Sequence, residues 1–108
     1  MSTFQMKPGD RKYALQYKLS DYAEGGGLLT GASVQFQMMD MNGATVVDAA
    51  GVVLDADGIV AYEWAEGDSD TPGTYRAEFK ITFSDSLVQH YPSAGFIVVQ
   101  IDADVPDS

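Results

Sequence analysis

The residues of this chain that could do chemistry are few. His90 is the one histidine among 108 residues, and there is no cysteine. With one histidine and no cysteine, we expect no histidine-based catalytic triad, no cysteine–histidine dyad and no zinc site. His90 precedes Tyr91-Pro92 at the expected end of a strand, so we interpret it as a surface or packing residue. The sequence therefore predicts a protein that is not an enzyme.

Two groups of carboxylates invite a comparison with cation sites. Asp55 and Asp57 lie in one turn, and Glu66, Asp68 and Asp70 lie in a later acidic stretch. Ca²⁺ takes about six to eight oxygen ligands from a loop, which in the common calcium loop ends in a bidentate Glu. Neither group matches this pattern. We therefore expect solvated acidic turns, with no metal ion and no cofactor.

Charge restricts the partners that the chain can bind. The formal net charge is −10, and the pI is about 4.1. Nucleic acids and anionic membranes both attract clusters of Lys and Arg, so we expect neither as a partner. The sequence shows no secretory signal pattern, and no apolar run approaches the ~20 residues of a membrane span. We therefore expect a soluble, cytoplasmic setting.

The elements that must position these side chains are short strands. Apolar and polar residues alternate with a period of two, and turn residues separate the alternating runs. Asn42-Gly43 predicts a hairpin with a type I′ turn, and the glycine run 25–27 predicts a slack loop. The last run is apolar on both faces, which indicates a central strand. The expected strands cover residues 12–19, 32–41, 44–48, 51–54, 59–64, 74–83, 86–91 and 95–101.

The segment from Asp70 to Tyr75, Asp-Thr-Pro-Gly-Thr-Tyr, has the pattern of a tyrosine corner. In immunoglobulin-like sandwiches such a tyrosine bonds back to the main chain a few residues upstream. A plain Pro-Gly turn before a strand is the alternative. Ala77 stands where an antibody domain has its second cysteine, so the fold would lack a disulfide. We predict an all-β chain with one immunoglobulin-like antiparallel β-sandwich of about seven to eight strands over residues 11–104, followed by a C-terminal tail at 105–108.

The N-terminal residues 1–10 are predicted to form an arm. Four of the six basic residues, Lys7, Arg11, Lys12 and Lys18, lie in the first eighteen positions, and none lies between Ser20 and Tyr75. The arm also carries apolar side chains without enough length for a core of its own. It is either an edge strand or frayed end, or an arm that docks on a neighbouring subunit. The residues expected to bind a partner are Phe4, Met6, Lys7, Arg11 and Lys12.

Several short motifs, taken together, resemble one protein family. They are Leu29-Thr30-Gly31-Ala32-Ser33-Val34-Gln35-Phe36, Gly58-Ile59-Val60-Ala61-Tyr62-Glu63-Trp64, the acidic loop and strand from Gly67 to Phe79, the strand from Tyr13 to Leu19, and Tyr91-Pro92 before 96–102. In order and spacing they resemble the immunoglobulin-like N-terminal domain of phage baseplate upper proteins and related short virion proteins of tailed phages. The baseplate proteins continue into further domains beyond the point where this sequence stops.

The resemblance implies a structural virion component that is assembled in the cytoplasm of an infected bacterium. Its partners would be capsid or tail subunits, with self-association as a further option. A decoration or accessory protein suits a small acidic chain of this kind. The alternative is a host-adhesion or carbohydrate-binding module on the virion, with Tyr22, Trp64 and Tyr91 as an aromatic platform.

Overall fold

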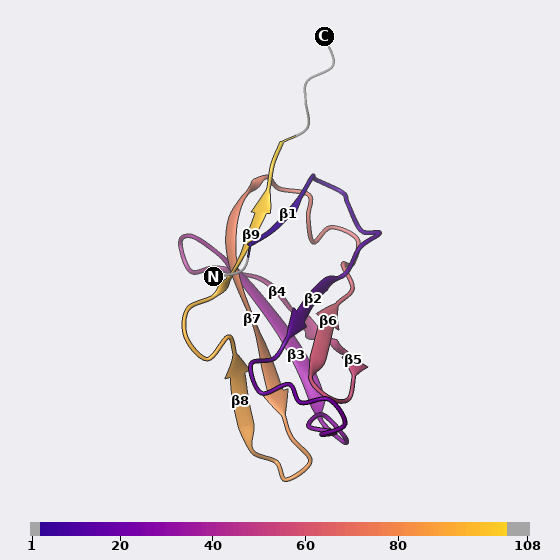
Figure 1. Cartoon of the computed structure of the whole chain (residues 1–108). Helices are drawn as coiled ribbons and strands as arrows, with labels where there is room; N and C mark the ends of the chain where they lie inside the picture. The colour runs from indigo at the N-terminus through magenta and orange to yellow at the C-terminus, as the bar shows by residue number, and fades with distance from the viewer. Residues whose placement is uncertain (1–2, 104–108) are drawn as a thin grey trace.

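The computed structural model describes residues 3–103 and shows nine strands in that part of the chain (Figure 1). Positions 1–2 of the predicted arm, residue 104 of the predicted sandwich and the predicted tail 105–108 lie outside the described residues. The strands are β1 (Thr3–Met6), β2 (Leu15–Lys18), β3 (Ser33–Asp40), β4 (Thr45–Ala50), β5 (Val52–Asp55), β6 (Ile59–Tyr62), β7 (Gly73–Thr82), β8 (Val88–Tyr91) and β9 (Ile97–Ile101). Residues 3–103 contain no helix that is long and apolar enough to cross a membrane.

The strands form two sheets that pack as a sandwich. The large sheet has the order β1-β9-β7-β3-β4, and β8 also pairs with β7, beside the half of β7 that β9 leaves uncovered. The small sheet has the order β2-β6-β5. β9 lies between β1 and β7, so the prediction of a central strand at 95–101 is confirmed.

The predicted all-β sandwich is confirmed, with two differences in detail. The described residues hold nine strands rather than seven to eight, because residues 3–6 of the predicted arm form β1. The sandwich is also not wholly antiparallel, since β1 runs parallel to β9, with Phe4 opposite Val99 and Met6 opposite Ile101. β1 pairs with the strand edge that β9 would otherwise leave open, which satisfies main-chain groups on both strands.

The core lies between the two sheets. Alternation along β3 and β7 sends Phe36 and Phe79 inward, and both are fully buried. The Phe36 ring stacks on Tyr62 of the small sheet, with ring centres 4.3 Å apart and planes 9° apart. Trp64, which follows β6, meets both rings edge-on. Aromatic pairs of this kind stabilise a core beyond the area that they bury, so these rings fix the small sheet against the large one.

The turn between β3 and β4 departs from the prediction. A hairpin forms at Asn42-Gly43, but only Gly43 has a positive φ, of 87°, whereas a type I′ turn needs two. The Asp40 carboxylate accepts hydrogen bonds from the main-chain N–H groups of Asn42 and Ala44, at 2.9 and 3.0 Å. A shift of register between Met38 and Met39 follows. The turn is therefore held by a carboxylate and a bulge rather than by two left-handed residues.

Candidate binding surface beside the first strand

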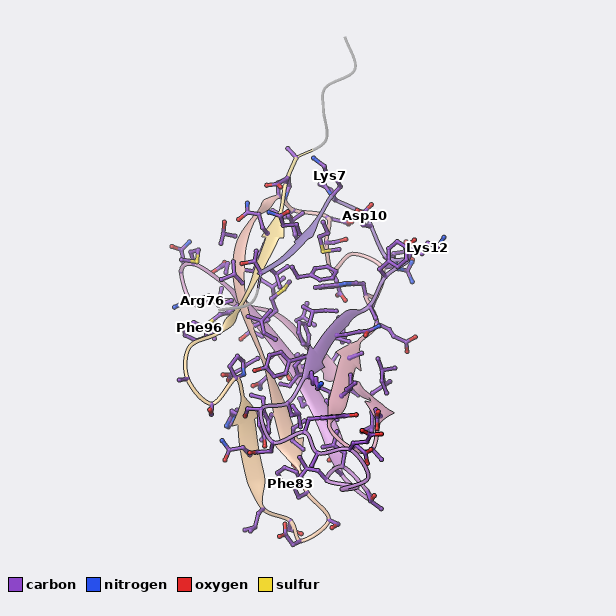
Figure 2. The ribbon with its side chains drawn as sticks, viewed as in Figure 1. Lys7, Asp10, Lys12, Arg76, Phe83 and Phe96 are labelled. Atoms are coloured by element: carbon purple, nitrogen blue, oxygen red, sulfur yellow. The ribbon has the colours of Figure 1, made fainter. Side chains whose placement is uncertain are left out.

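An open groove of about 370 Å³ lies between β1 and the segment that leads to β2. Figure 2 shows Lys7, Asp10 and Lys12 along this segment, at the end of the sandwich where β1 lies. We call the groove and the two strands beside it the groove side. The residues that line the groove are Phe4, Gln5, Met6, Asp10, Arg11, Lys12 and Tyr13.

The floor of the groove is part of the core. Met6 is only 8% exposed, and Phe4 packs partly buried against the core cluster. The Phe4 ring centre lies 5.9 Å from that of Trp64, and the Arg11 Nε donates a hydrogen bond to the Trp64 carbonyl oxygen at 3.2 Å. Phe4 of β1 and Arg11 of the segment before β2 thus both contact Trp64, which holds the two walls of the groove together. Phe4 and Met6 thus contribute to this chain's own core, and their groove-facing atoms remain accessible.

A turn at residues 7–10 connects the two segments that line the groove. The Lys7 N–H donates to the Asp10 carboxylate at 3.0 Å, and the Asp10 N–H donates to the Lys7 carbonyl oxygen at 3.1 Å. Gly9 donates to the buried Ser69 hydroxyl at 3.1 Å, which ties the turn to the acidic loop before β7. The Lys7 ammonium donates to the Ala103 carbonyl oxygen at 3.4 Å. The segment is therefore anchored at both its start and its middle.

The rim of the groove is cationic and partly aromatic. Arg11 and Lys12 are both exposed, and Tyr13 is 73% exposed. The Lys12 ammonium lies 5.5 Å from the centre of the Tyr13 ring, within the range of a cation–π contact. Asp10 is the one carboxylate in the lining. An apolar floor with a cationic rim suits an apolar segment that also carries carboxylates.

Four of the five residues predicted to bind a partner line this groove, namely Phe4, Met6, Arg11 and Lys12, and Lys7 lies directly beside it. Whether they bind a partner remains a prediction. Sequence reasoning missed Gln5, Asp10 and Tyr13. The alternation of Tyr13 with Leu15 and Tyr17 predicts a strand that includes Tyr13, but β2 begins only at Leu15.

The carboxylates that resembled cation ligands instead stabilise turns. Asp57 accepts hydrogen bonds from the N–H groups of Gly25 and Gly27 at 2.7 and 2.9 Å, and these bonds hold its pKa below the usual range. Asp68 accepts from the Tyr62 hydroxyl and from the Ala65 N–H. Within residues 3–103, no three His, Cys, Asp or Glu side chains are grouped as metal ligands would be. The glycine run 25–27 is therefore an anchored loop rather than the slack connection that was predicted.

The other predicted residues lie apart from the groove. His90 is exposed on β8. Two of the three aromatic residues predicted for a carbohydrate platform are buried: Trp64 is 3% exposed and Tyr91 is 2% exposed. Both belong to the core cluster, and the Tyr91 hydroxyl also donates a hydrogen bond to Asp21 at 2.7 Å. Tyr22 is half-buried under the Lys18 ammonium, which lies 4.3 Å from its ring centre. These three rings do not form an exposed platform.

Comparison with known proteins yields one structural likeness. No family model matches the sequence, and no curated protein matches it. The fold is similar to that of CopC from Methylosinus trichosporium OB3b, with a TM-score of 0.61 over 100% of this chain and 91% of that one. The two sequences are 16% identical, so this likeness bears on the fold alone.

Proposed function

We propose that this protein is a non-enzymatic structural component of a tailed-phage virion, a decoration or accessory protein that binds neighbouring capsid or tail subunits. The observation that supports binding is the groove side. It offers an apolar floor, a cationic rim of Arg11 and Lys12, and an edge strand, β1, within one surface. The virion setting is supported by the resemblance of the sequence to phage immunoglobulin-like virion proteins.

The chemistry of the groove favours a protein partner. An edge strand can pair with an extended segment of another chain, while side-chain pockets beside it select that segment. Residues 3–103 show no grouped metal ligands, and the one histidine, His90, lies on β8 and does not line the groove. A surface that combines apolar, aromatic and arginine side chains has the composition typical of the central part of a protein interface.

The experiment asks whether the chain is built into particles through the groove side. Tailed phages from the host that encodes the chain are purified and probed with an antibody against it, and its copy number per particle is measured by quantitative mass spectrometry. We expect several copies per particle. The variant Arg11→Glu should enter particles less, by about tenfold if one charged contact is reversed. The matched control is Arg76→Glu, on β7.

Two outcomes would contradict the proposal. If purified particles lack the chain, the virion role is wrong. If Arg11→Glu and Arg76→Glu particles carry as much of the chain as wild-type particles do, binding does not use the groove side.

A further inference from the structure

The sandwich has two open sides, and their chemistry differs. β1 and β4 are the two ends of the large sheet, and β2 and β5 are the two ends of the small sheet. The groove side contains β1 and β2. The opposite side, which we call the β4/β5 side, contains the two strands that follow each other around Gly51. Each side therefore presents one edge of each sheet.

The β4/β5 side is apolar and acidic. Val46 is 42% exposed, Val53 is 37% exposed and Leu54 is 52% exposed. Val53 is paired with Val60, which is fully buried. Residues directly opposite on neighbouring strands share a face, so Val53 points between the sheets and is exposed only because nothing covers this edge. Edge strands are commonly protected by lysine, but β4 and β5 contain none and carry the carboxylates of Asp48 and Asp55 instead.

The groove side is complementary to the β4/β5 side. It has the cations Arg11 and Lys12 around an apolar floor, whereas the β4/β5 side has exposed aliphatic side chains and the carboxylates of Asp48 and Asp55. Each carboxylate accepts one hydrogen bond within the chain, from Gln35 and from the Asp57 N–H. No Lys or Arg lies between Ser20 and Tyr75. A two-fold contact between two β4/β5 sides would place carboxylates near carboxylates, offset only in part by Lys80 of β7, which lines one hollow together with Asp48. This repulsion disfavours that arrangement.

We propose that the groove side binds the β4/β5 side of a second copy of this chain. This contact is heterologous, because two different surfaces meet, so each dimer keeps one free groove side and one free β4/β5 side. The proposal deepens the protein-binding role proposed above by naming the partner, and it rests on that role. The net charge of −10 opposes association at long range, but at about 0.15 M salt this repulsion is screened beyond ~8 Å while charges in contact still interact.

Sedimentation velocity of the purified chain tests the proposal at about 0.15 M salt. We expect the average sedimentation coefficient to rise between ~10 µM and ~1 mM protein. Lys12→Glu reverses a charge on the groove side, and Leu54→Lys adds a cation to the β4/β5 side. Each variant alone should associate at least about tenfold more weakly than the wild type.

Each variant has a matched control. Gln89→Glu places the same glutamate at an exposed position of β8, which belongs to neither side, and Leu87→Lys makes the same change at a leucine that is 67% exposed between β7 and β8. Both controls should associate as the wild type does. Thermal melts of all four variants show that each is folded.

Mixing the two variants is the decisive measurement. Lys12→Glu keeps an intact β4/β5 side, and Leu54→Lys keeps an intact groove side. Their mixture should form a one-to-one dimer that does not grow, because the two remaining sides are the altered ones. A wild-type chain that stays monomeric throughout, or a mixture that associates no better than either variant alone, overturns the proposal. Association of Lys12→Glu at the wild-type level also overturns it, since the contact would then not depend on the cationic rim of the groove side.

The result is separable from the proposed function. A monomeric chain that is nevertheless built into particles would overturn self-association and leave the virion role intact. A chain that associates head to tail but is absent from particles would overturn the virion role and leave self-association intact.

Discussion

The Tyr75 hydroxyl donates a hydrogen bond to the main-chain carbonyl oxygen of Thr71, 2.7 Å away, and so closes the turn that leads into β7. Gly73 lies inside this turn with a φ of 154°, and a Cβ there would be 3.6 Å from the Tyr75 ring. This is the tyrosine corner that the sequence predicted, and the alternative of a plain Pro-Gly turn is excluded. The corner positions the first residues of the longest strand.

Tyr75→Phe should weaken the fold without changing it. The substitution removes one hydrogen bond and keeps the ring, so we expect a loss of about 1 kcal/mol in the free energy of unfolding. For a domain of this size the melting temperature should fall by about 4–8 °C. Differential scanning calorimetry measures the change, and Tyr13→Phe, at an exposed tyrosine, is the control. Equal melting temperatures for wild type and Tyr75→Phe would contradict the stabilising role of the corner.

Asp57 should make the fold sensitive to acid. Hydrogen bonds from Gly25 and Gly27 lower the pKa of its carboxyl in the folded chain. The stability that follows is fully present above the unfolded pKa of about 4 and is lost as the pH falls through the folded pKa. Asp57→Asn should therefore melt lower than the wild type at pH 7 and lose less stability on acidification. Glu24→Gln, beside Gly25 in the loop that Asp57 binds, is the control. An unchanged acid profile for Asp57→Asn would refute this role.

Tyr91 should make the fold sensitive to base. Burial, together with the hydrogen bond to Asp21, raises its pKa to about 12. A raised folded pKa gives stability that is complete below the unfolded value of about 10 and is lost as the pH rises towards 12. Denaturant melts between pH 9 and 12 should show this loss, and Tyr91→Phe should reduce its slope. Some slope will remain, because burial and Asp68 also raise the pKa of Tyr62. If Tyr91→Phe leaves the slope of stability against pH unchanged, then Tyr91 does not cause the loss of stability at high pH.

Gly51 should not tolerate a larger residue. A Cβ at this position would lie 2.8 Å from Cγ1 of Val34 and 2.9 Å from the Ala61 carbonyl oxygen. The chain passes from the large sheet to the small sheet here, and the Gly51 N–H donates to the Val34 carbonyl oxygen at 2.9 Å. Gly51→Ala should cost about 1–3 kcal/mol through displacement of these neighbours. Urea unfolding measures it, and a midpoint within error of the wild type would show that the junction can widen.

The strands with clear alternation were predictable because a buried face imposes a period of two on the sequence. β3 and β7 illustrate this, since eight residue pairs join them and every buried side chain in the two strands is aliphatic, aromatic or Met. β1 could not be recognised in the same way. It has four residues, and the strand that pairs with it begins at Ile97, so no local pattern identifies the partner. The segment 1–10 therefore read equally well as an arm or as an edge strand.

The candidate site was predictable only in part, for a related reason. The clustering of Arg11 and Lys12 near the start of the chain is visible in the sequence, but the groove depends on where Trp64 lies in the fold. Likewise, the bonds from Gly25 and Gly27 to Asp57 join residues about thirty positions apart. Composition suggested a slack loop and a solvated carboxylate there. The sequence of each segment carries no sign that the two segments meet.

The position of β9 between β1 and β7 has a consequence for how the chain is made. β1 leaves the ribosome well before its pairing partner, which is synthesised only at residues 97–101. The Met6 carbonyl oxygen receives its hydrogen bond from the N–H of Asp102. Until then β7 has a bare edge beside residues 73–77, and Phe4 has no strand to hold it against the core. Pairing over so large a separation in sequence is slow, so the nascent chain carries unpaired strand edges until residues 97–101 have been made.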